Sequence, residues 1–249
     1  MHAVITAGGT LPPAFAGEIG TAIKALAPLG RQRLIDPAID AARACGVAGI
    51  AVVGPAAVTE YCAGRIDRAL PASADGKRNI ALALRAFPAA ERLIFLTCDL
   101  PFVEAGALQA FIDASAPFAV TMALAPADAY AAAFPDAPPH TVSLARERYA
   151  NGSVFVIDRS AVDAVERVAG RFFAARKSLL RLATLLGPAL CLRFVAGTLR
   201  IEDIEGQAER LLRVRARAVR NAGPGLCYDV DDVRAWAYAH SLAQAQARE

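Results

Sequence analysis

The fold is decided by residues 93–102, LIFLTCDLPF. The first four residues form a continuous apolar run, which is typical of a strand covered on both faces in a parallel sheet. A short polar segment that ends in Asp99 follows, and Pro101 ends the strand because proline has no backbone N–H to donate. The stretch therefore predicts a strand in the middle of a sheet, with Asp99 at its carboxyl end.

Two roles fit Asp99 at this position. Ligands bind at the carboxyl edge of open α/β sheets, where a carboxylate suits Mg²⁺, a hard cation that keeps waters and substrate phosphates as its other ligands. The alternative is that Asp99 caps a predicted helix over residues 104–114. Its position alone leaves both interpretations open.

The rest of the chain alternates between predicted strands and predicted helices. The predicted strands cover residues 3–6, 49–54, 93–96, 118–124, 141–144, 154–157 and 213–220. The predicted helices cover residues 36–45, 55–65, 80–87, 104–114, 161–175, 179–186, 201–212 and 234–245. Residues 11–21 are interpreted as a loop, and residues 125–140 as a loop with a short helical piece. This order predicts an α/β three-layer sandwich with a mostly parallel sheet, a late antiparallel strand and a single domain over residues 1–249.

Size and composition narrow the class of protein. The chain has 249 residues, of which 55% are hydrophobic, so it can bury a substantial core. Its net charge of +3 is too small to indicate a nucleic-acid partner, and we predict none. The five cysteines are scattered and form no CxxC pair, which favours reduced thiols in a cytoplasmic protein over a disulfide framework or a zinc site.

We expect neither a signal peptide nor a membrane span. The chain opens directly into a predicted strand, so a secretory leader is not expected. Residues 179–195 form the most apolar long segment, but they contain Arg181 and Arg193 and are interrupted by Gly187-Pro188, which argues against a spanning helix.

Basic residues gather in the C-terminal half of the chain. Residues 171–220 contain eleven lysines and arginines but only four acidic residues, Glu202, Asp203, Glu205 and Glu209. This excess is compatible with an anionic substrate, although solvated faces account for many such charges. A membrane-surface role for the basic, leucine-rich residues 176–193 is a further alternative.

A glycine turn follows the first predicted strand. Glycines such as Gly8 and Gly9 let backbone N–H groups approach a phosphate or a nucleotide without a Cβ in the way. The pattern is not GxGxxG and no GKS or GKT follows, so neither the dinucleotide motif nor the P-loop is present. Lys24 is a compact cation suited to phosphate charge, and its alternative role is that of an exposed loop lysine.

Three further polar groups stand beside predicted elements. Asn79 lies at the start of a predicted helix, where it either caps the helix or places its amide against a nucleobase or ribose. Asn151-Gly152 comes directly before the predicted strand over residues 154–157, and Asp229 and Asp231 lie near the last helix.

Taken in order, these motifs resemble one family over nearly the whole chain. The motifs are AGG after the first strand, Lys24-Ala-Leu with Leu29-Gly30, a second strand that ends in VVG, CDLPF, Asn151-Gly152, and Asp229-Val-Asp231. They resemble the MobA-like nucleotidyltransferases, a group that includes the molybdenum-cofactor guanylyltransferase and, more distantly, sugar-phosphate and methylerythritol-phosphate nucleotidyltransferases.

The resemblance implies a Rossmann-like fold that couples a nucleoside triphosphate (NTP) to an anionic, in particular phosphorylated, small molecule and releases pyrophosphate. It implies that Lys24 and Asp99 are catalytic, and that Mg²⁺ is held by Asp99 with Asp229 or Asp231 as the second carboxylate. It also implies a nucleotide site at Ala7, Gly8, Gly9, Lys24, Gly76 and Asn79, and an acceptor site at Asn151, Gly152 and Lys177. In such a transfer, a metal ion and a lysine stabilise charge on the phosphate oxygens without a covalent protein intermediate.

Two features depart from the family pattern. The family commonly carries an arginine soon after the double glycine, whereas here no basic residue stands between Gly9 and Lys24. The late acidic motif is also shorter than in the family, because Asp231 is followed directly by Asp232-Val233. Arg176, Lys177 and Arg181 are candidate anion contacts outside the core motifs, or they belong to a plain surface helix.

Three other functions are weighed against this one. A metal-dependent glycosyltransferase normally has Asp-x-Asp at the central strand, whereas Asp99-Leu-Pro offers a single carboxylate. A nicotinamide-dependent reductase would need a three-glycine turn and an acidic residue after the second strand, and both are missing. The third is a nucleotide-binding protein that has lost its activity, which the missing arginine favours and the intact Lys24, Asp99 and Asp231 oppose.

Overall fold

The computed structural model describes residues 1–138, 141–175 and 187–246. The strands are β1 His2–Thr6, β2 Pro28–Leu29, β3 Gln32–Arg33, β4 Ile50–Gly54, β5 Arg68–Pro71, β6 Arg92–Thr97, β7 Val120–Pro126, β8 Thr141–Leu144, β9 Glu147–Asp158 and β10 Ala216–Val219. The α-helices are α1 Pro13–Ile19, α2 Asp36–Ala44, α3 Ala56–Tyr61, α4 Gly76–Leu84, α5 Ala105–Ala114, α6 Ala127–Ala133, α7 Val162–Ala175, α9 Pro188–Val195, α10 Ile201–Leu212 and α11 Val233–Gln246. Short 3₁₀ helices are η1 Lys24–Leu26, η2 Arg159–Ala161 and η3 Pro224–Leu226.

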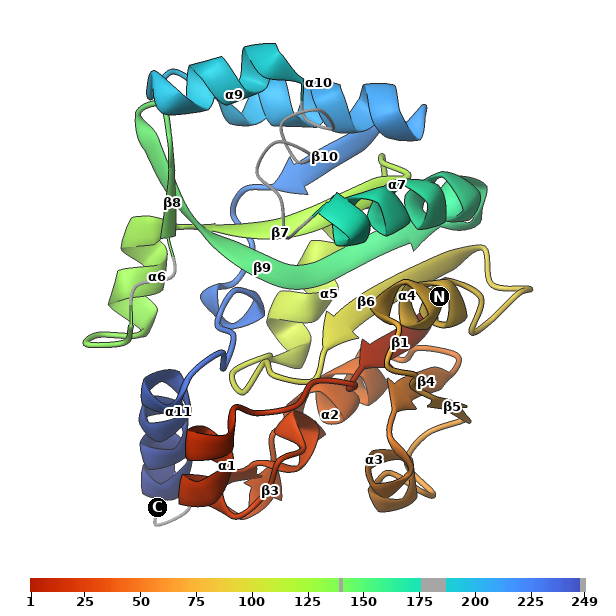
Figure 1. The fold of residues 1–249 in the computed structure, drawn as a ribbon, viewed down its shortest axis with the longest axis vertical. Helices are drawn as coiled ribbons and strands as arrows, with labels where there is room; N and C mark the ends of the chain where they lie inside the picture. The colour runs from red at the N-terminus through yellow and green to blue at the C-terminus, as the bar shows by residue number, and fades with distance from the viewer. Residues whose placement is uncertain (139–140, 176–186, 247–249) are drawn as a thin grey trace.

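The main sheet has the strand order β10-β7-β9-β6-β1-β4-β5, with β8 paired to β9 outside this path (Figure 1). β6 is central and parallel to β1, which is parallel to β4 on its other side. The long strand β9 runs antiparallel between β6 and β7. The predicted α/β sandwich, its mostly parallel sheet and its late antiparallel strand are therefore confirmed.

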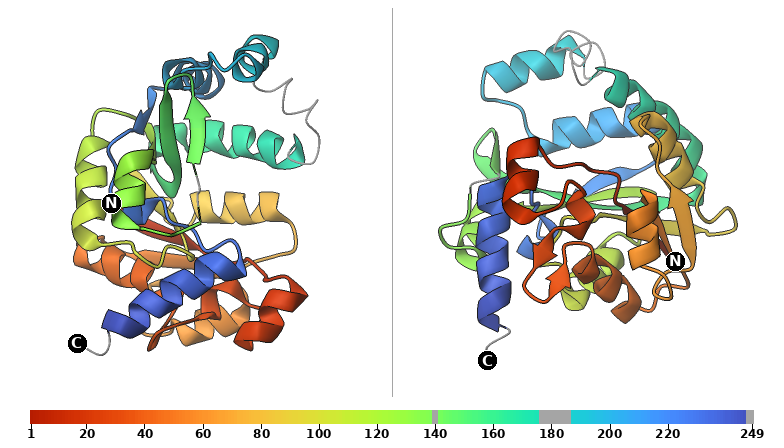
Figure 2. Two further views of the ribbon diagram at one scale, coloured as in Figure 1. Left: turned by 90° about the vertical axis from the view of Figure 1, so that its left-hand side faces the viewer. Right: turned by 60° about the horizontal axis from the view of Figure 1, so that its bottom comes forward.

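Helices cover both faces of the sheet because its central strands are apolar on both sides (Figures 1 and 2). In β1, Ala3 and Ile5 join the core beneath α2 and α5, whereas Val4 points to the core beneath α4 and α7. A third cluster lies where α10 covers β7 and β10. Strands buried in this way give the continuous apolar runs from which the sheet was predicted.

Two helices were missed because prolines were interpreted as breaks. Residues 11–21 are not a loop throughout: α1 begins at Pro13 and ends at Ile19, and the next residue, Gly20, caps it with a left-handed φ of 76°. Pro188, which was interpreted as the end of a helix, is the first residue of α9. Proline is well suited to the first turn of a helix, where no N–H is needed. The predicted helix over residues 179–186 lies outside the described residues.

The bounds of several other helices and strands also differ from the predicted ones. β9 begins at Glu147, seven residues before the predicted start, because β8 and β9 form a hairpin. α4 begins at Gly76, four residues before the predicted start, because its first turn is polar and does not show the apolar pattern of a helix. The side chain of Asp75 caps this helix by accepting a hydrogen bond of 2.9 Å from the Lys77 N–H. The edge strand β5 was not predicted, because it is short and largely exposed. Within the described residues, no helix is long and apolar enough to cross a membrane.

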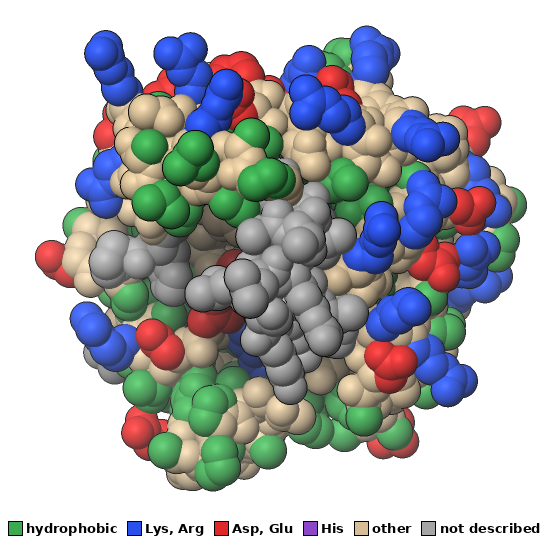
Figure 3. All heavy atoms as spheres, turned by 45° about the horizontal axis from the view of Figure 1, so that its top comes forward, with side chains coloured by type: hydrophobic (Ala, Val, Ile, Leu, Met, Phe, Trp, Pro, Cys, Tyr) green, Lys and Arg blue, Asp and Glu red, His purple; other side chains and the backbone are tan. Residues whose placement is uncertain are grey.

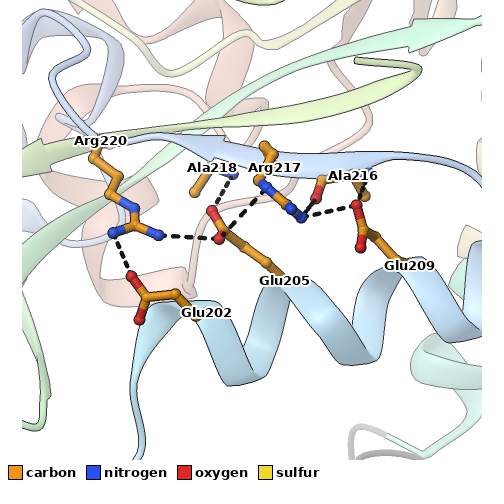
Figure 4. Close-up of polar contacts among 7 residues, drawn as sticks. All are labelled: Glu202, Glu205, Glu209, Ala216, Arg217, Ala218 and Arg220. Atoms are coloured by element: carbon orange, nitrogen blue, oxygen red, sulfur yellow. Dashed lines mark hydrogen bonds and ion pairs between the residues drawn. The ribbon is translucent and has the colours of Figure 1, made fainter. Parts of the chain in front are cut away.

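Carboxylates of α10 hold the edge strand β10 (Figure 4). Glu205 has a side chain that is only 7% exposed, and it accepts hydrogen bonds of 3.0 Å from both the Ala218 N–H and the Arg220 guanidinium. Arg220 also pairs with the exposed Glu202 at 2.6 Å, and Arg217 pairs with Glu209 at 2.8 Å. Because Glu205 is the buried member of this network, its removal should lower the free energy of unfolding more than removal of an exposed member.

We therefore expect Glu205→Ala to lower the free energy of unfolding by about 3 kcal/mol, because it leaves the Ala218 N–H unpaired and two arginines without their buried partner. Urea denaturation measures the change. Glu202→Ala is the control: its side chain is 58% exposed, so it should cost less than about 1 kcal/mol. Equal losses in the two variants would contradict the account.

Candidate active site

The carboxyl ends of β1, β4 and β6 bring the glycine turn and Asp99 together. Thr6 and Thr97 are paired across β1 and β6, and the Cys98 N–H continues the ladder to the Thr6 carbonyl at 3.1 Å. The Ala7 N–H bonds to the Val53 carbonyl at 2.8 Å. Parallel strands in register thus end at one edge, where the sequence predicted a ligand site.

Lys24 joins the glycine turn to two carboxylates. Its backbone N–H donates to the Gly9 carbonyl at 3.1 Å, and η1 directs its side chain back to the sheet edge. The ammonium nitrogen Nζ donates to Asp99 Oδ2 and, at 2.9 Å, to Asp231 Oδ1. Burial favours the neutral form of Lys24, but the charges and hydrogen bonds of Asp99 and Asp231 outweigh it and raise the lysine pKa, so Lys24 stays charged.

The segment that carries Asp229 and Asp231 is anchored on the central strand. The Val230 N–H donates to the Asp99 carbonyl at 3.1 Å. Tyr228 is fully buried within an aromatic cluster, where its ring packs against those of Phe102 and Phe134, and its hydroxyl donates to the Ala235 carbonyl at 2.9 Å. This anchoring brings two late aspartates to a strand end more than a hundred residues earlier in the chain.

The carboxyl group of Asp229 is buried and has a raised pKa. Its Oδ2 accepts a hydrogen bond of 2.7 Å from the Ser153 hydroxyl on β9, whereas its Oδ1 is buried and has no hydrogen-bond partner among the described residues. Burial, followed by the negative charge of Asp99, raises the pKa of Asp229 to about 7. Asp99 likewise has a buried Oδ1 without a partner.

These carboxylates are suited to a magnesium ion whose remaining ligands are waters and phosphate oxygens. Among the described residues, no three His, Cys, Asp or Glu side chains converge to form a metal site on their own. Mg²⁺ is commonly bound through one or two carboxylates, with waters and phosphate oxygens as the other ligands. The unpartnered oxygens of Asp99 and Asp229 are donors of this kind, and a divalent cation would relieve their repulsion.

A cavity of about 310 Å³ opens beside this cluster. Its lining includes the predicted nucleotide residues Gly8, Gly9, Lys24, Gly76 and Asn79, together with Asp99. Five residues predicted from separate motifs therefore converge on one concave site next to the carboxylates. The site pairs a cation and backbone N–H groups with candidate metal ligands, which is the equipment for binding a polyphosphate.

Comparison with known proteins decides the family. Residues 3–184 match the MobA-like NTP transferase domain, which is well over half of the chain. The chain belongs to this family. The MobA-like resemblance and the prediction of a nucleotidyltransferase are thereby confirmed.

Solved structures agree with the fold of this MobA-like transferase. A hypothetical transferase from Thermus thermophilus is 27% identical, with a TM-score of 0.82 over 94% of this chain and 98% of that one. A putative glucose-1-phosphate thymidylyltransferase from Bacillus anthracis is 15% identical, with a TM-score of 0.61 over 98% and 96%. The 2-C-methyl-D-erythritol 4-phosphate cytidylyltransferase from Thermus thermophilus is also 15% identical, with a TM-score of 0.58 over 98% of each chain. No curated protein matches the sequence.

Three predicted residues have structural contacts that limit their roles. Ala7 is fully buried and extends β1, so it does not line the cavity of this MobA-like transferase. Asn79 is not a helix cap, because Asp75 caps α4; its amide instead bonds Ser73, with Oδ1 accepting from the Ser73 N–H at 2.8 Å and Nδ2 donating to the Ser73 carbonyl at 2.9 Å. Asp99 does not cap α5 either, since that helix begins after Glu104 and the carboxylate pairs with Lys24.

Two of the three predicted acceptor residues, Asn151 and Gly152, do not line the cavity. Gly152 lies buried in a bulge of β9, where the extra residues of β9 stand opposite Ala123 of β7, and an added Cβ would lie 2.7 Å from the Ala123 carbonyl oxygen. Asn151 is exposed on the same strand, and Lys177 lies outside the described residues. Gly152 is therefore explained by close packing of the backbone, and an acceptor role for these three residues remains a prediction.

The excess of positive charge is partly neutralised. The four acidic residues of residues 171–220 all form ion pairs with arginines, including a pair between Arg193 and Asp203. Figure 3 shows Lys and Arg side chains mixed with acidic and apolar ones on the side of α9 and α10.

The segment that follows the double glycine, where the family commonly carries an arginine, forms α1. Its Phe15 packs near Trp236 of α11, so this segment helps to hold the C-terminal helix.

Sequence reasoning missed two hydroxyl residues of the site. Ser153 follows Asn151-Gly152 directly and is the residue of that motif that contacts Asp229. Thr97 lies two residues before Asp99 and lines the cavity, and its hydroxyl is buried without a partner. Their closeness in sequence to predicted motifs was the available signal, but hydroxyls are common beside strand ends and did not stand out.

The raised pKa of Asp229 predicts a pH-dependent stability in protein freed of metal by EDTA. Its pKa is about 7 when folded against an ordinary value of 3.8, so between these values the folded protein keeps a proton that the unfolded chain has lost. This protonation therefore stabilises the folded protein most below pH 3.8, and the stabilisation is lost as the pH rises to about 7. Over this interval the free energy of unfolding falls by at most about 1.4 kcal/mol per pH unit. Asp229→Asn should gain stability relative to the wild type over this interval in denaturation at pH 4.5 and 7.5. Parallel pH profiles would contradict the assignment.

Gly152→Ala should destabilise the protein by about 1–3 kcal/mol, because its Cβ would overlap the backbone of β7. Gly106→Ala on α5 is the control: an added Cβ meets nothing within 4 Å there, and alanine favours the helix. Thermal denaturation measures both changes. An unchanged midpoint in Gly152→Ala would show that the packing account is wrong.

Proposed function

We propose that this protein is a magnesium-dependent nucleotidyltransferase that couples an NTP to an anionic small-molecule acceptor and releases pyrophosphate. The observation that supports this most strongly is the position of the Lys24 ammonium, which lies between Asp99 and Asp231 and beside the Gly8-Gly9 turn. Within this proposal, residues 1–249 act as one domain.

The triphosphate would lie over the glycine turn. Backbone N–H groups of Gly8 and Gly9 and the Lys24 ammonium are the donors that line this part of the cavity. Lys24 can serve the phosphates because Asp231, one of its two partners, has a side chain that is 65% exposed and can turn away. The charge of the lysine then moves from a surface carboxylate to the nucleotide without a change in the fold.

Asp99 and Asp229 would hold the metal. Asp229 is preferred over Asp231 as the second ligand because its Oδ1 is buried and unpartnered, whereas Asp231 Oδ1 already bonds Lys24. When bound, Mg²⁺ would stabilise negative charge on the phosphate oxygens. Ligation requires an ionised carboxylate, so metal affinity should rise with pH up to about 7, the pKa of Asp229.

The reaction would be a direct displacement at the α-phosphorus. An oxygen of the acceptor forms the new bond to phosphorus, the bond to the bridging oxygen between the α- and β-phosphates breaks, and pyrophosphate leaves. Lys24 stabilises the charge on the phosphates, and the chain otherwise contributes by holding the two reactants in line. No covalent intermediate on the protein is required.

A thermal-shift panel tests the nucleotide site. CTP, GTP, ATP and UTP are each compared with and without Mg²⁺ on the wild type. A triphosphate at about 100 times its dissociation constant should add about 2.7 kcal/mol of stability, which corresponds to several degrees. We expect one nucleotide to give a shift that requires Mg²⁺ and that Asp99→Asn and Lys24→Met abolish.

Asp232→Asn is the matched control for this panel. It removes a neighbouring charge but keeps a side chain that can accept from the Ala235 N–H, as Asp232 does at 2.8 Å, so the nucleotide shift should persist. The absence of any shift in the wild type would overturn the proposal. A shift without pyrophosphate release, once an acceptor is supplied, would instead indicate the inactive nucleotide-binding protein.

A further inference from the structure

A second cavity, which the function proposed above does not use, adjoins the nucleotide cavity. It has a volume of about 320 Å³ and lies between α4, α7 and the sheet face formed by β6 and β9. α4 and α7 lie side by side over this face (Figure 1). Ile80, Phe95 and Val165 are representative of its lining, which is apolar apart from three hydroxyl residues.

The three hydroxyl residues, Thr6, Thr97 and Ser153, lie at the end of this cavity that adjoins the proposed reaction centre. Thr6 and Thr97 line this cavity and the nucleotide cavity alike, so the two spaces share a wall at the carboxyl ends of β1 and β6. Ser153 lines the apolar cavity and donates its hydrogen bond to Asp229. Thr97 lies at this boundary, and its hydroxyl is buried without a hydrogen-bond partner among the described residues.

Protein interiors are normally close-packed, and an empty apolar cavity lowers stability as its volume grows. This one is about twice the roughly 150 Å³ of an engineered apolar cavity that binds benzene. Ligand sites combine such apolar walls with a few polar groups at one end, which is the arrangement found here.

We propose that this cavity holds the body of the acceptor, so that the acceptor is a small anionic amphiphile: a compact aliphatic or aromatic group that carries a phosphate. This inference rests on the function proposed above and names the substrate class of that site. The apolar body lies between α4 and α7, and the phosphate reaches Lys24 and the metal carboxylates past Thr97 and Ser153.

The same geometry discriminates against sugar phosphates. The hydroxyl groups of a sugar would enter a space whose walls offer them almost no hydrogen-bond partners, and buried polar groups without partners are costly. In the reaction, an oxygen of the acceptor phosphate bonds the α-phosphorus and pyrophosphate leaves, which gives a diphosphate that joins a nucleoside to an apolar group.

Isothermal titration of the full chain with Mg²⁺ tests this inference, with octyl phosphate, below its micelle concentration, and glycerol 3-phosphate as the two probes. We expect octyl phosphate to bind at least tenfold more tightly. Ala169→Phe on α7 fills the cavity and should remove this advantage. Ala164→Phe, on the same helix but outside the cavity lining, should keep it.

If Ala169→Phe does not fold, Val165→Ser, which replaces an apolar wall with a hydroxyl, should weaken octyl phosphate binding severalfold. Equal affinities of the two probes for the wild type, or an octyl phosphate affinity that neither variant changes, would overturn the inference. The nucleotide panel separates the two claims. A magnesium-dependent nucleotide shift without a preference for octyl phosphate contradicts only the acceptor class, whereas a missing nucleotide shift contradicts the transferase site.

Discussion

The arrangement of the site depends on one partly buried ammonium group. Lys24 Nζ contacts Asp99, 75 residues away in the sequence, and Asp231, 207 residues away. Without this cation, the carboxylates of Asp99, Asp229 and Asp231 would repel one another in a partly buried setting. Burial, and after it the negative charge of Asp99, raises the pKa of Asp229 even with the lysine present. The lysine thus ties the first loop, the central strand and the C-terminal segment to one point.

The fold supplies the rigid frame for this contact. β6 is central and buried, so Asp99 has little freedom, and the Val230 N–H fixes the late aspartates on the Asp99 carbonyl. The C-terminal helix is fastened in turn to the N-terminal region, where the Trp236 indole donates to the Pro28 carbonyl at 2.7 Å. A polyphosphate that replaced Asp231 as a partner of Lys24 would therefore meet a site that is already assembled.

The sequence predicted what short-range chemistry determines. The apolar run before Asp99 identified the central strand, and the order of weak motifs identified the family. The sequence could not show which carboxylate has an unpartnered oxygen, because that depends on contacts with distant residues: Asp229 is bonded by Ser153, and Asp231 by Lys24. Nor could it show that Gly152 lies in a bulge of β9 packed against Ala123 of β7, since that contact joins two strands that are distant in sequence. Proline at the start of α1 and α9 was interpreted as a break, because the same residue ends one helix and begins another.

The most direct test is a crystal structure with Mn²⁺ in place of Mg²⁺ and a non-hydrolysable analogue of the NTP that the protein binds. Anomalous scattering then locates the metal independently of the phosphates. The account predicts Mn²⁺ on the free oxygens of Asp99 and Asp229, with the triphosphate against Gly8, Gly9 and Lys24. A triphosphate bound elsewhere, or a metal that contacts neither aspartate, would contradict it.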